Sequence, residues 1–316
     1  MQPAEVPTIT EIPVTDKDAG PYGIAAGPDG ALWLTFVHKG SIACLGLDGA
    51  LTEYPLDSPE CRPMVIAPGP DGAMWFTRNQ DHRIGRVTAD GVTEAFEVPS
   101  PDSGPYGIAA GPDGAMWFTE MNTDRIGRIT VQGEVTEFPL PVEGGFASAI
   151  TAGPDGALWF TLNQANAVGR ITTGGDVTLY PLPTPGAAPV GITSDGVALW
   201  CVEIGAGQLG RITTDGEIEE FPLADRAAKP HAIVGAGAGE CWFTEWGGNR
   251  VGHISVSGVN PASGELAEIS AYDLPSPSSE PHGITVGPDG ALWVALETGS
   301  VARVAPAPRR AQPRRA

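Results

Sequence analysis

The strongest constraint on the fold of this chain is a phrase that recurs seven times along its 316 residues. Each copy has an isoleucine near its start, and these are Ile24, Ile66, Ile108, Ile150, Ile192, Ile233 and Ile284, at spacings of 42, 42, 42, 42, 41 and 51 residues. A tryptophan follows each isoleucine by eight or nine residues, at Trp33, Trp75, Trp117, Trp159, Trp200, Trp242 and Trp293. A fixed period of this length is typical of solenoids and propellers, in which each copy is one structural unit.

The third copy shows what one unit contains. Residues 107–120, "GIAAGPDGAMWFTE", predict a strand, a tight Gly-Pro-Asp-Gly turn and a second strand. Residues 126–131, "IGRITV", and 134–140, "EVTEFPL", predict two more strands around a short turn. Four short antiparallel strands in about 42 residues are the sequence form of a propeller blade. The chain is therefore predicted to be all-β, a seven-bladed β-propeller of four-stranded blades with the first strand of each blade innermost.

The seventh copy indicates how the ring closes, because it ends without a fourth strand. The missing strand is found near the N-terminus, where residues 8–14, "TITEIPV", match the fourth strand of the other copies. Pairing would satisfy the free edge of the last blade. We therefore expect a single propeller domain over residues 1–305. The basic Pro-, Ala- and Arg-rich residues 306–316 are expected to form a disordered tail.

Charge and composition exclude several classes of partner. The net charge of −20 would repel a phosphate backbone and an anionic membrane surface, so we expect neither nucleic acid nor membrane as a partner. The four cysteines are scattered, without a metal-binding or disulfide spacing. Neither a signal peptide nor an apolar run of 18 residues is recognisable, which favours a cytoplasmic protein. A closed ring without an exposed apolar edge favours a monomer.

The repeat also separates structural positions from candidate functional ones. Residues that recur in most copies, such as the tryptophan and the Gly-Pro-Asp-Gly turn, are predicted to serve the fold. Positions that differ are candidates for chemistry. The start of the first strand and the end of the second share one face of the ring, where they surround a mouth of the central channel. The second residue of the first strand varies in this way: Tyr22, Met64, Tyr106, Ser148, Val190, His231 and His282.

Blade seven alone combines a carboxylate before the proline with a histidine after it, in Glu280-Pro281-His282. Histidine is suited to proton abstraction near neutral pH. Glu280 and Glu297 flank the two inner strands at the same end and could together hold a hard cation such as Mg²⁺. The alternative is that they are two solvated acids of an acidic protein.

Three other side chains on this face are weaker candidates for the functional site. Trp246 is the one tryptophan outside the repeat register and is a candidate for stacking against a ligand. His38 and His82 lie in loops that face the same mouth. Neither has an acidic partner in register, so both are predicted to be surface histidines.

The repeated phrases Pro-Tyr-Gly-Ile, Gly-Pro-Asp-Gly-Ala-x-Trp-Phe-Thr-Glu, Ile-Gly-Arg-Ile-Thr and Thr-Glu-Phe-Pro-Leu resemble those of the virginiamycin B lyase (streptogramin B lyase) family. The resemblance extends over residues 8 to about 305. It also includes the Pro-His of "KPHAI", the Glu-x-His of blade seven and the last glutamate of "WVALE".

The resemblance implies a role for each of these residues. His282 would be the catalytic base, His231 and Tyr22 would bind substrate, and Glu280 and Glu297 would hold Mg²⁺. The implied reaction is a carbon–oxygen lyase reaction that linearises type B streptogramins, which are small cyclic depsipeptides, and so gives antibiotic resistance. Elimination at the threonyl ester would leave a dehydrated residue and a free carboxylate.

Three other functions remain open at this point. Many propellers only bind, so a ligand-binding or protein-interaction module of the same family is one alternative. A lyase acting on another cyclic depsipeptide is the second. A lactone hydrolase of the gluconolactonase type is the third, although six blades are expected there. The complete set of two glutamates and two histidines favours the lyase.

Overall fold

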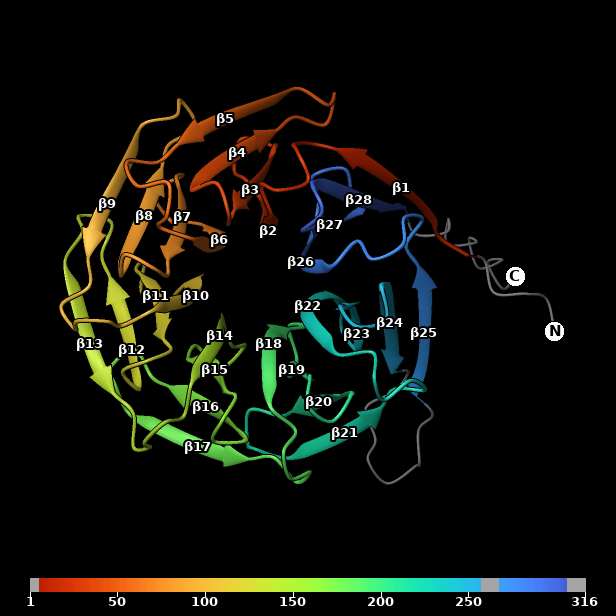
Figure 1. Ribbon diagram of the computed structural model, residues 1–316. Coiled ribbons are helices and arrows are strands. Elements are labelled where there is room, and N and C mark those ends of the chain that lie inside the picture. The colour runs from red at the N-terminus through yellow and green to blue at the C-terminus, as the bar shows by residue number, and fades with distance from the viewer. Residues whose placement is uncertain (1–5, 257–266, 306–316) are drawn as a thin grey trace, which may run out of the picture.

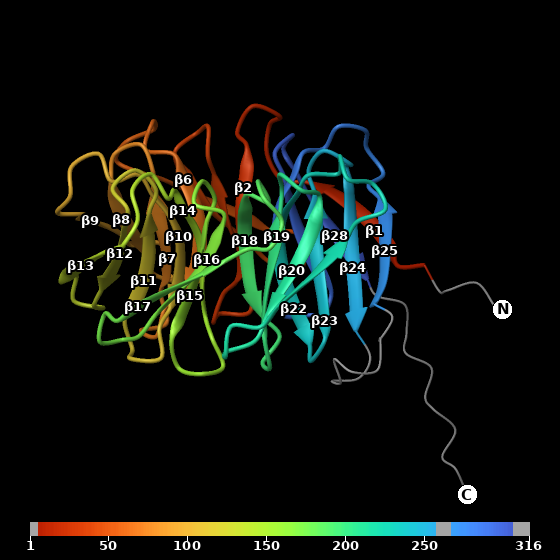
Figure 2. The ribbon, with the colours of Figure 1, turned by 90° about the horizontal axis from the view of Figure 1, so that it is seen from below.

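The computed structural model describes residues 6–256 and 267–305, and it confirms the predicted fold class. Seven four-stranded antiparallel sheets stand in a ring around a central channel (Figure 1). Seen from the side, the ring carries the loops between strands on its two faces (Figure 2). Within residues 6–256 and 267–305, no helix is long and apolar enough to cross a membrane.

Each blade has the same strand order from the channel outward. The innermost strands are β2 (Pro21–Ala26), β6 (Pro63–Pro68), β10 (Pro105–Ala110), β14 (Ala147–Ala152), β18 (Pro189–Ser194), β22 (Pro230–Gly237) and β26 (Pro281–Val286). The second strands are β3 (Leu32–Phe36), β7 (Met74–Arg78), β11 (Met116–Glu120), β15 (Leu158–Leu162), β19 (Leu199–Glu203), β23 (Glu240–Glu245) and β27 (Leu292–Leu296).

The two outer positions complete the blades. The third strands are β4 (Ser41–Leu45), β8 (Arg83–Val87), β12 (Arg125–Ile129), β16 (Ala167–Ile171), β20 (Gln208–Ile212), β24 (Arg250–Val256) and β28 (Ser300–Ala305). The outermost strands are β5 (Leu51–Pro55), β9 (Thr93–Glu97), β13 (Val135–Pro139), β17 (Val177–Pro181), β21 (Ile218–Pro222), β25 (Ala267–Asp273) and β1 (Thr8–Pro13).

The ring closes through the N-terminal strand, as predicted. β1 pairs antiparallel with β28, from Thr8 opposite Ala305 to Pro13 opposite Ser300. The last blade is thus built from both ends of the chain, and blade one (β2–β5) lies directly beside blade seven (β26–β28 with β1) (Figure 1). The predicted tail, residues 306–316, lies outside the described residues, as does most of the insertion between β24 and β25.

The residues that recur in the repeat hold each blade together. In blade two, Trp75 Nε1 donates to Asp71 Oδ1 at 3.0 Å, and Arg86 Nε donates to Asp71 Oδ2 at 2.7 Å. The Trp75 ring is fully buried and stacks on Phe96 of the outer strand, with ring centroids 5.5 Å apart. The aspartate of the Gly-Pro-Asp-Gly turn therefore joins the tryptophan to the third strand. The same tryptophan–aspartate–arginine contacts recur in blades three, four and seven, which confirms the structural role predicted for the tryptophan and the turn.

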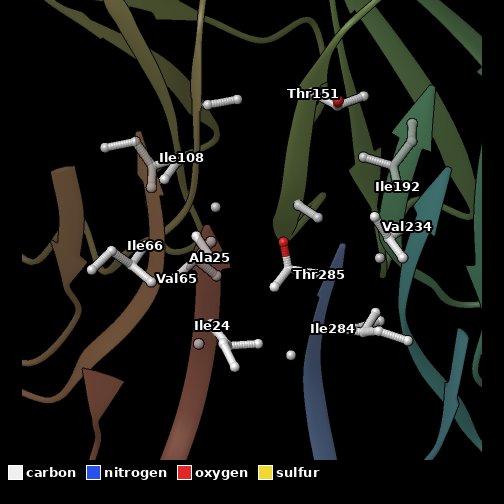
Figure 3. Close-up of a pocket in the computed structure, with 18 of the residues that line it drawn as sticks. Ile24, Ala25, Val65, Ile66, Ile108, Thr151, Ile192, Val234, Ile284 and Thr285 are labelled. Atoms are coloured by element: carbon white, nitrogen blue, oxygen red, sulfur yellow. The ribbon is translucent and has the colours of Figure 1, made fainter. Parts of the chain in front are cut away.

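The inner strands enclose an apolar cavity of about 400 Å³ along the axis of the ring. Isoleucines from successive blades line it, among them Ile24, Ile66, Ile108, Ile192 and Ile284 (Figure 3). Among the described residues that line this cavity there is no carboxylate, so acid–base chemistry involving a carboxylate must take place elsewhere on the ring.

Candidate active site at the mouth of the channel

One backbone hydrogen bond recurs at the mouth of the channel in blades one to four, six and seven, and it defines the rim there. The residue just after the second strand donates its N–H to the carbonyl of the residue just before the first strand. In blade seven Glu297 donates in this way to Glu280, at 3.1 Å, and in blade six Trp246 donates to Lys229, also at 3.1 Å. The sequence-predicted metal pair, Glu280 and Glu297, therefore occupies one such rim pair. Trp246 is the register equivalent of Glu297.

Glu280 has left-handed backbone geometry, with a φ of 53°, which costs a non-glycine residue about 1–2 kcal/mol. The same conformation occurs before the first strand of every blade, at Gly20, Arg62, Gly104, Phe146, Ala188, Lys229 and Glu280. The strained backbone therefore belongs to the blade architecture, and only the side chain is particular to blade seven. The side chain of Glu280 is exposed to solvent at the mouth.

Four aromatic side chains from blades one, three, six and seven meet where the channel opens. The Tyr22 hydroxyl lies 2.6 Å from the Tyr106 hydroxyl and 3.4 Å from His231 Nε2. The His282 ring lies 4.4 Å from the Tyr22 ring and 4.7 Å from the His231 ring, between centroids. Three predicted site residues are thus brought together, and Tyr106 joins them. Tyr106 occupies the same position in blade three as Tyr22 in blade one, and this shared residue type could have identified it from the sequence.

A threonine fixes the spacing between the two histidine strands. Thr244 Oγ1, on β23, accepts the N–H of Ala232 at 3.0 Å and donates to the carbonyl of His282 at 2.9 Å. Because Ala232 directly follows His231, this one hydroxyl ties the backbones of both histidines together. The relative position of His231 and His282 is therefore set by the scaffold and does not depend on their side chains.

Glu297 is the centre of the charged part of the site. Its Oε2 lies 2.5 Å from His282 Nε2, and its Oε1 lies 2.7 Å from His38 Nε2. The hydrogen bond from His282, together with the bond from His38, outweighs the opposing effect of burial and lowers the pKa of Glu297 to about 2. Glu297 is therefore ionised at neutral pH. His38 is exposed, as predicted for a surface histidine, but the prediction that it has no acidic partner is wrong, since Glu297 of the neighbouring blade binds it.

His282 is the more enclosed of the two histidines bound to Glu297, with 7% of its surface exposed. Its Nδ1 atom is buried and has no hydrogen-bond partner. A neutral imidazole that donates Nε2–H to Glu297 keeps a free lone pair on Nδ1. A carboxylate on one nitrogen and a free lone pair on the other is the arrangement of a histidine base oriented by an acid.

The surroundings of His231 favour its neutral form. Desolvation by burial, together with the nearby His282, lowers the pKa of His231 to about 3. His231 is therefore neutral near pH 7. A neutral imidazole can donate or accept a hydrogen bond, which suits binding better than proton transfer.

Trp246 lies on the same rim and is 37% exposed. The Lys229 ammonium lies 5.0 Å from the centroid of its ring, within cation–π distance. The structure therefore places a partly exposed aromatic ring on the rim of blade six, at the register position that Glu297 occupies in blade seven.

The other acids near the end of the second strand do not reach the mouth. Glu120 pairs with Pro105, whereas the residue that pairs with the equivalent Pro281 is Leu296, one position before Glu297. Successive side chains of a strand point in opposite directions, so this single step separates a buried position from a rim position. Glu120, Glu203 and Glu245 are accordingly buried inside their blades.

Replacing Glu120 by glutamine is expected to stabilise the protein at alkaline pH. Burial, with Glu137 nearby, raises the pKa of Glu120 to about 7 from 4.5. The native carboxyl keeps its proton while the unfolded chain releases it, so native stability falls as pH rises from 4.5 to about 7 and stays low above it. Glutamine removes this loss, and the free energy of unfolding should rise by about 1–3 kcal/mol near pH 8. Denaturant unfolding should show little difference near pH 4.5; an equal difference at both pH values would contradict the assignment.

Comparison with known proteins agrees with this geometry. The model of the virginiamycin B lyase family matches residues 7–304. A virginiamycin B lyase of Streptomyces coelicolor is 58% identical over 36 residues, a segment that spans 11% of this chain and 12% of that protein. A crystal structure of virginiamycin B lyase from Staphylococcus aureus is 44% identical, with a TM-score of 0.88, and the match covers 95% of this chain and 100% of that one.

A second Staphylococcus aureus structure, with the same identity, coverage and TM-score, is of a catalytically inactive histidine-to-alanine variant with quinupristin. The family match extends over almost the whole chain, and the solved relatives share its length, its ring of blades and more than two fifths of its residues. The chain belongs to the virginiamycin B lyase family.

Proposed function

We propose that this protein is a carbon–oxygen lyase that linearises type B streptogramins, such as virginiamycin B and quinupristin, with the help of Mg²⁺. The observation that carries the proposal is the His282–Glu297 pair beside His231 at the mouth of the channel. The quinupristin complex of the Staphylococcus aureus relative supports the substrate class. Opening the lactone ring would inactivate the antibiotic and so confer resistance.

His282 would remove the α-proton of the threonine whose side-chain oxygen forms the ester. The electron pair of the Cα–H bond would form the Cα–Cβ double bond, and the Cβ–O bond would break to release a carboxylate. Glu297, ionised and 2.5 Å from His282, would stabilise the imidazolium as it forms. No water is consumed, so the product is a linear peptide with a dehydrated residue.

His231, Tyr22 and Trp246 would bind and orient the substrate. His231 stays neutral, and burial with the nearby Tyr106 raises the pKa of Tyr22 well above its ordinary value. Both side chains therefore offer uncharged hydrogen-bonding groups to the peptide. The exposed Trp246 ring offers an apolar face. Tyr22 and His231 also line the cavity of about 400 Å³ inside the ring, which is too small for a cyclic depsipeptide, so we expect the substrate to sit on the mouth.

The donor set at the rim fits Mg²⁺. A carboxylate offers about four lone-pair directions, and Glu297 uses one on each oxygen for a histidine, so two remain. Glu280, its backbone partner on the rim, adds an exposed carboxylate. Over residues 6–256 and 267–305 no three acidic, histidine or cysteine side chains are arranged so that together they could hold a metal ion, so most ligands would be water or substrate. Mg²⁺ commonly binds through one or two carboxylates and retained waters. Bound there, it would polarise the ester and stabilise developing negative charge.

Incubation with quinupristin followed by reversed-phase chromatography tests the function. We expect catalytic amounts of protein to convert all of the cyclic compound to a new species. A binding module, the alternative for many propellers, would shift the protein's melting temperature with quinupristin but leave the compound unchanged. Recovery of intact quinupristin after prolonged incubation with stoichiometric protein would contradict the proposal.

A further inference from the structure

His38 lies in the loop between β3 and β4 of blade one and crosses to the neighbouring blade. Its Nε2 is 2.7 Å from Glu297 Oε1 of blade seven, and 43% of its side chain is exposed. The contact joins residues 259 positions apart in sequence and exists only because the ring closes between these two blades.

The position of the His38 side chain is specified by its surroundings. Val37 N donates to the carbonyl of Gly20 at 2.9 Å, and His38 N donates to that of Ala19 at 3.1 Å, so the loop is tied to the segment before β2. A Cβ atom on Gly20 would lie 2.4 Å from His38 Cδ2. The missing side chain of Gly20 therefore provides the space in which the imidazole lies.

The consequence for Glu297 is geometric. With a histidine on each oxygen, the carboxylate cannot rotate about its last bond without breaking a hydrogen bond. Its two remaining lone-pair directions then point to fixed places. Hydrogen bonds of this kind orient metal-ligating carboxylates, and their loss typically weakens metal affinity by roughly 10–100-fold.

We infer that His38 is a positioning residue that holds the Glu297 carboxylate in the orientation required to bind Mg²⁺ and to face His282. The inference rests on the proposed metal role of Glu280 and Glu297, and it assigns a task to a loop histidine that does not touch the substrate-binding cluster. His38 acts through Glu297 and not on the reacting atoms.

Titration of the purified protein with Mg²⁺ alone, by isothermal titration calorimetry, tests this inference. His38→Ala should weaken the Mg²⁺ dissociation constant by roughly 10–100-fold. His38→Gln should restore most of the affinity, because its amide N–H can reach the same carboxylate oxygen. His82→Ala is the matched control: it removes a histidine from the equivalent loop of blade two, where Nδ1 accepts the N–H of Gly104. It should bind Mg²⁺ like the unmodified protein.

Two outcomes would overturn the inference, and they differ in what else they contradict. Equal Mg²⁺ affinity in His38→Ala and the unmodified protein would overturn the role of His38 and leave the metal site standing. Failure of the unmodified protein to bind Mg²⁺ would overturn both that role and the proposed metal site. Thermal unfolding of each variant in EDTA identifies a loss of fold, and a folded His38→Gln variant with the weak affinity of His38→Ala would also count against the inference.

Discussion

Replacement of His282 by alanine is expected to lower the rate of streptogramin ring opening by about 10²–10⁴-fold, the range that a general base contributes. The fold should persist, because the same position of the sister blades holds Met64, Ser148 and Val190. The backbone of residue 282 also keeps its hydrogen bond from Thr244, which involves only the carbonyl. The loss should therefore appear in kcat, with the melting temperature little changed.

His82→Ala provides the control for this experiment, since it removes a histidine from the same face outside the cluster. It should open the ring at the unmodified rate. If His282→Ala also retained the unmodified rate, His282 would not be the base, and the assignment of the mouth as the reaction site would lose its main support.

Replacement of Glu297 by glutamine is the second change with a large expected effect. The amide would keep the shape but lose the negative charge that stabilises the imidazolium of His282 and binds the cation. By analogy with other carboxylates that orient a catalytic histidine, we expect a fall of about 10²–10⁴-fold in kcat. EDTA should inactivate the unmodified protein and Mg²⁺ should restore it, whereas the residual rate of Glu297→Gln should respond to neither.

Glu120→Gln is the matched acid-to-amide control, because Glu120 is buried in blade three, away from the mouth. It should retain full, Mg²⁺-dependent activity. An unmodified protein whose rate is unchanged by exhaustive EDTA treatment would show that the metal role of Glu280 and Glu297 is wrong. A Glu297→Gln variant that Mg²⁺ restores fully would show that Glu297 is not a required ligand.

The fold could be predicted from the sequence because each blade is a local unit. The tryptophan, the turn aspartate and the arginine of one blade contact one another within about 15 residues, as Asp71, Trp75 and Arg86 do. Blades two, three, four and seven make the same set of contacts, so the repeat shows the pattern of one blade several times. Ring closure was also predictable, since the N-terminal strand carries the pattern that the seventh copy lacks.

The candidate site was predictable only in part. Comparing the copies identified His231, His282, Glu280 and Glu297, because these residues depart from the pattern at positions whose place on the mouth follows from the strand order. His38 was missed because its partner Glu297 lies at the other end of the chain, and the contact forms only across the closure of the ring. The residue at this loop position differs from copy to copy, so comparing the copies does not single out His38.

The structural consequence of a shift of one residue was not predicted from the sequence. Glu120, Glu203 and Glu245 end their strands at the position of Leu296, not of Glu297, and the strand alternation turns them into the blade. The offset is visible in the sequence, where Glu120 lies three residues after Trp117 and Glu297 four after Trp293, and the strand pairing shows that it separates a buried position from a rim position. The same pairing explains why Trp246 reaches the rim, since it follows Glu245 as Glu297 follows Leu296.

The mass of the quinupristin product tests the central claim most directly, namely that His282 opens the ring by elimination. After complete conversion, high-resolution mass spectrometry should give a linear product with the same mass as the cyclic compound, and fragmentation should locate the dehydrated residue at the former threonine. A product heavier by one water, with an intact threonine side chain, would mean that the ester is hydrolysed, and would contradict the lyase chemistry proposed for this site.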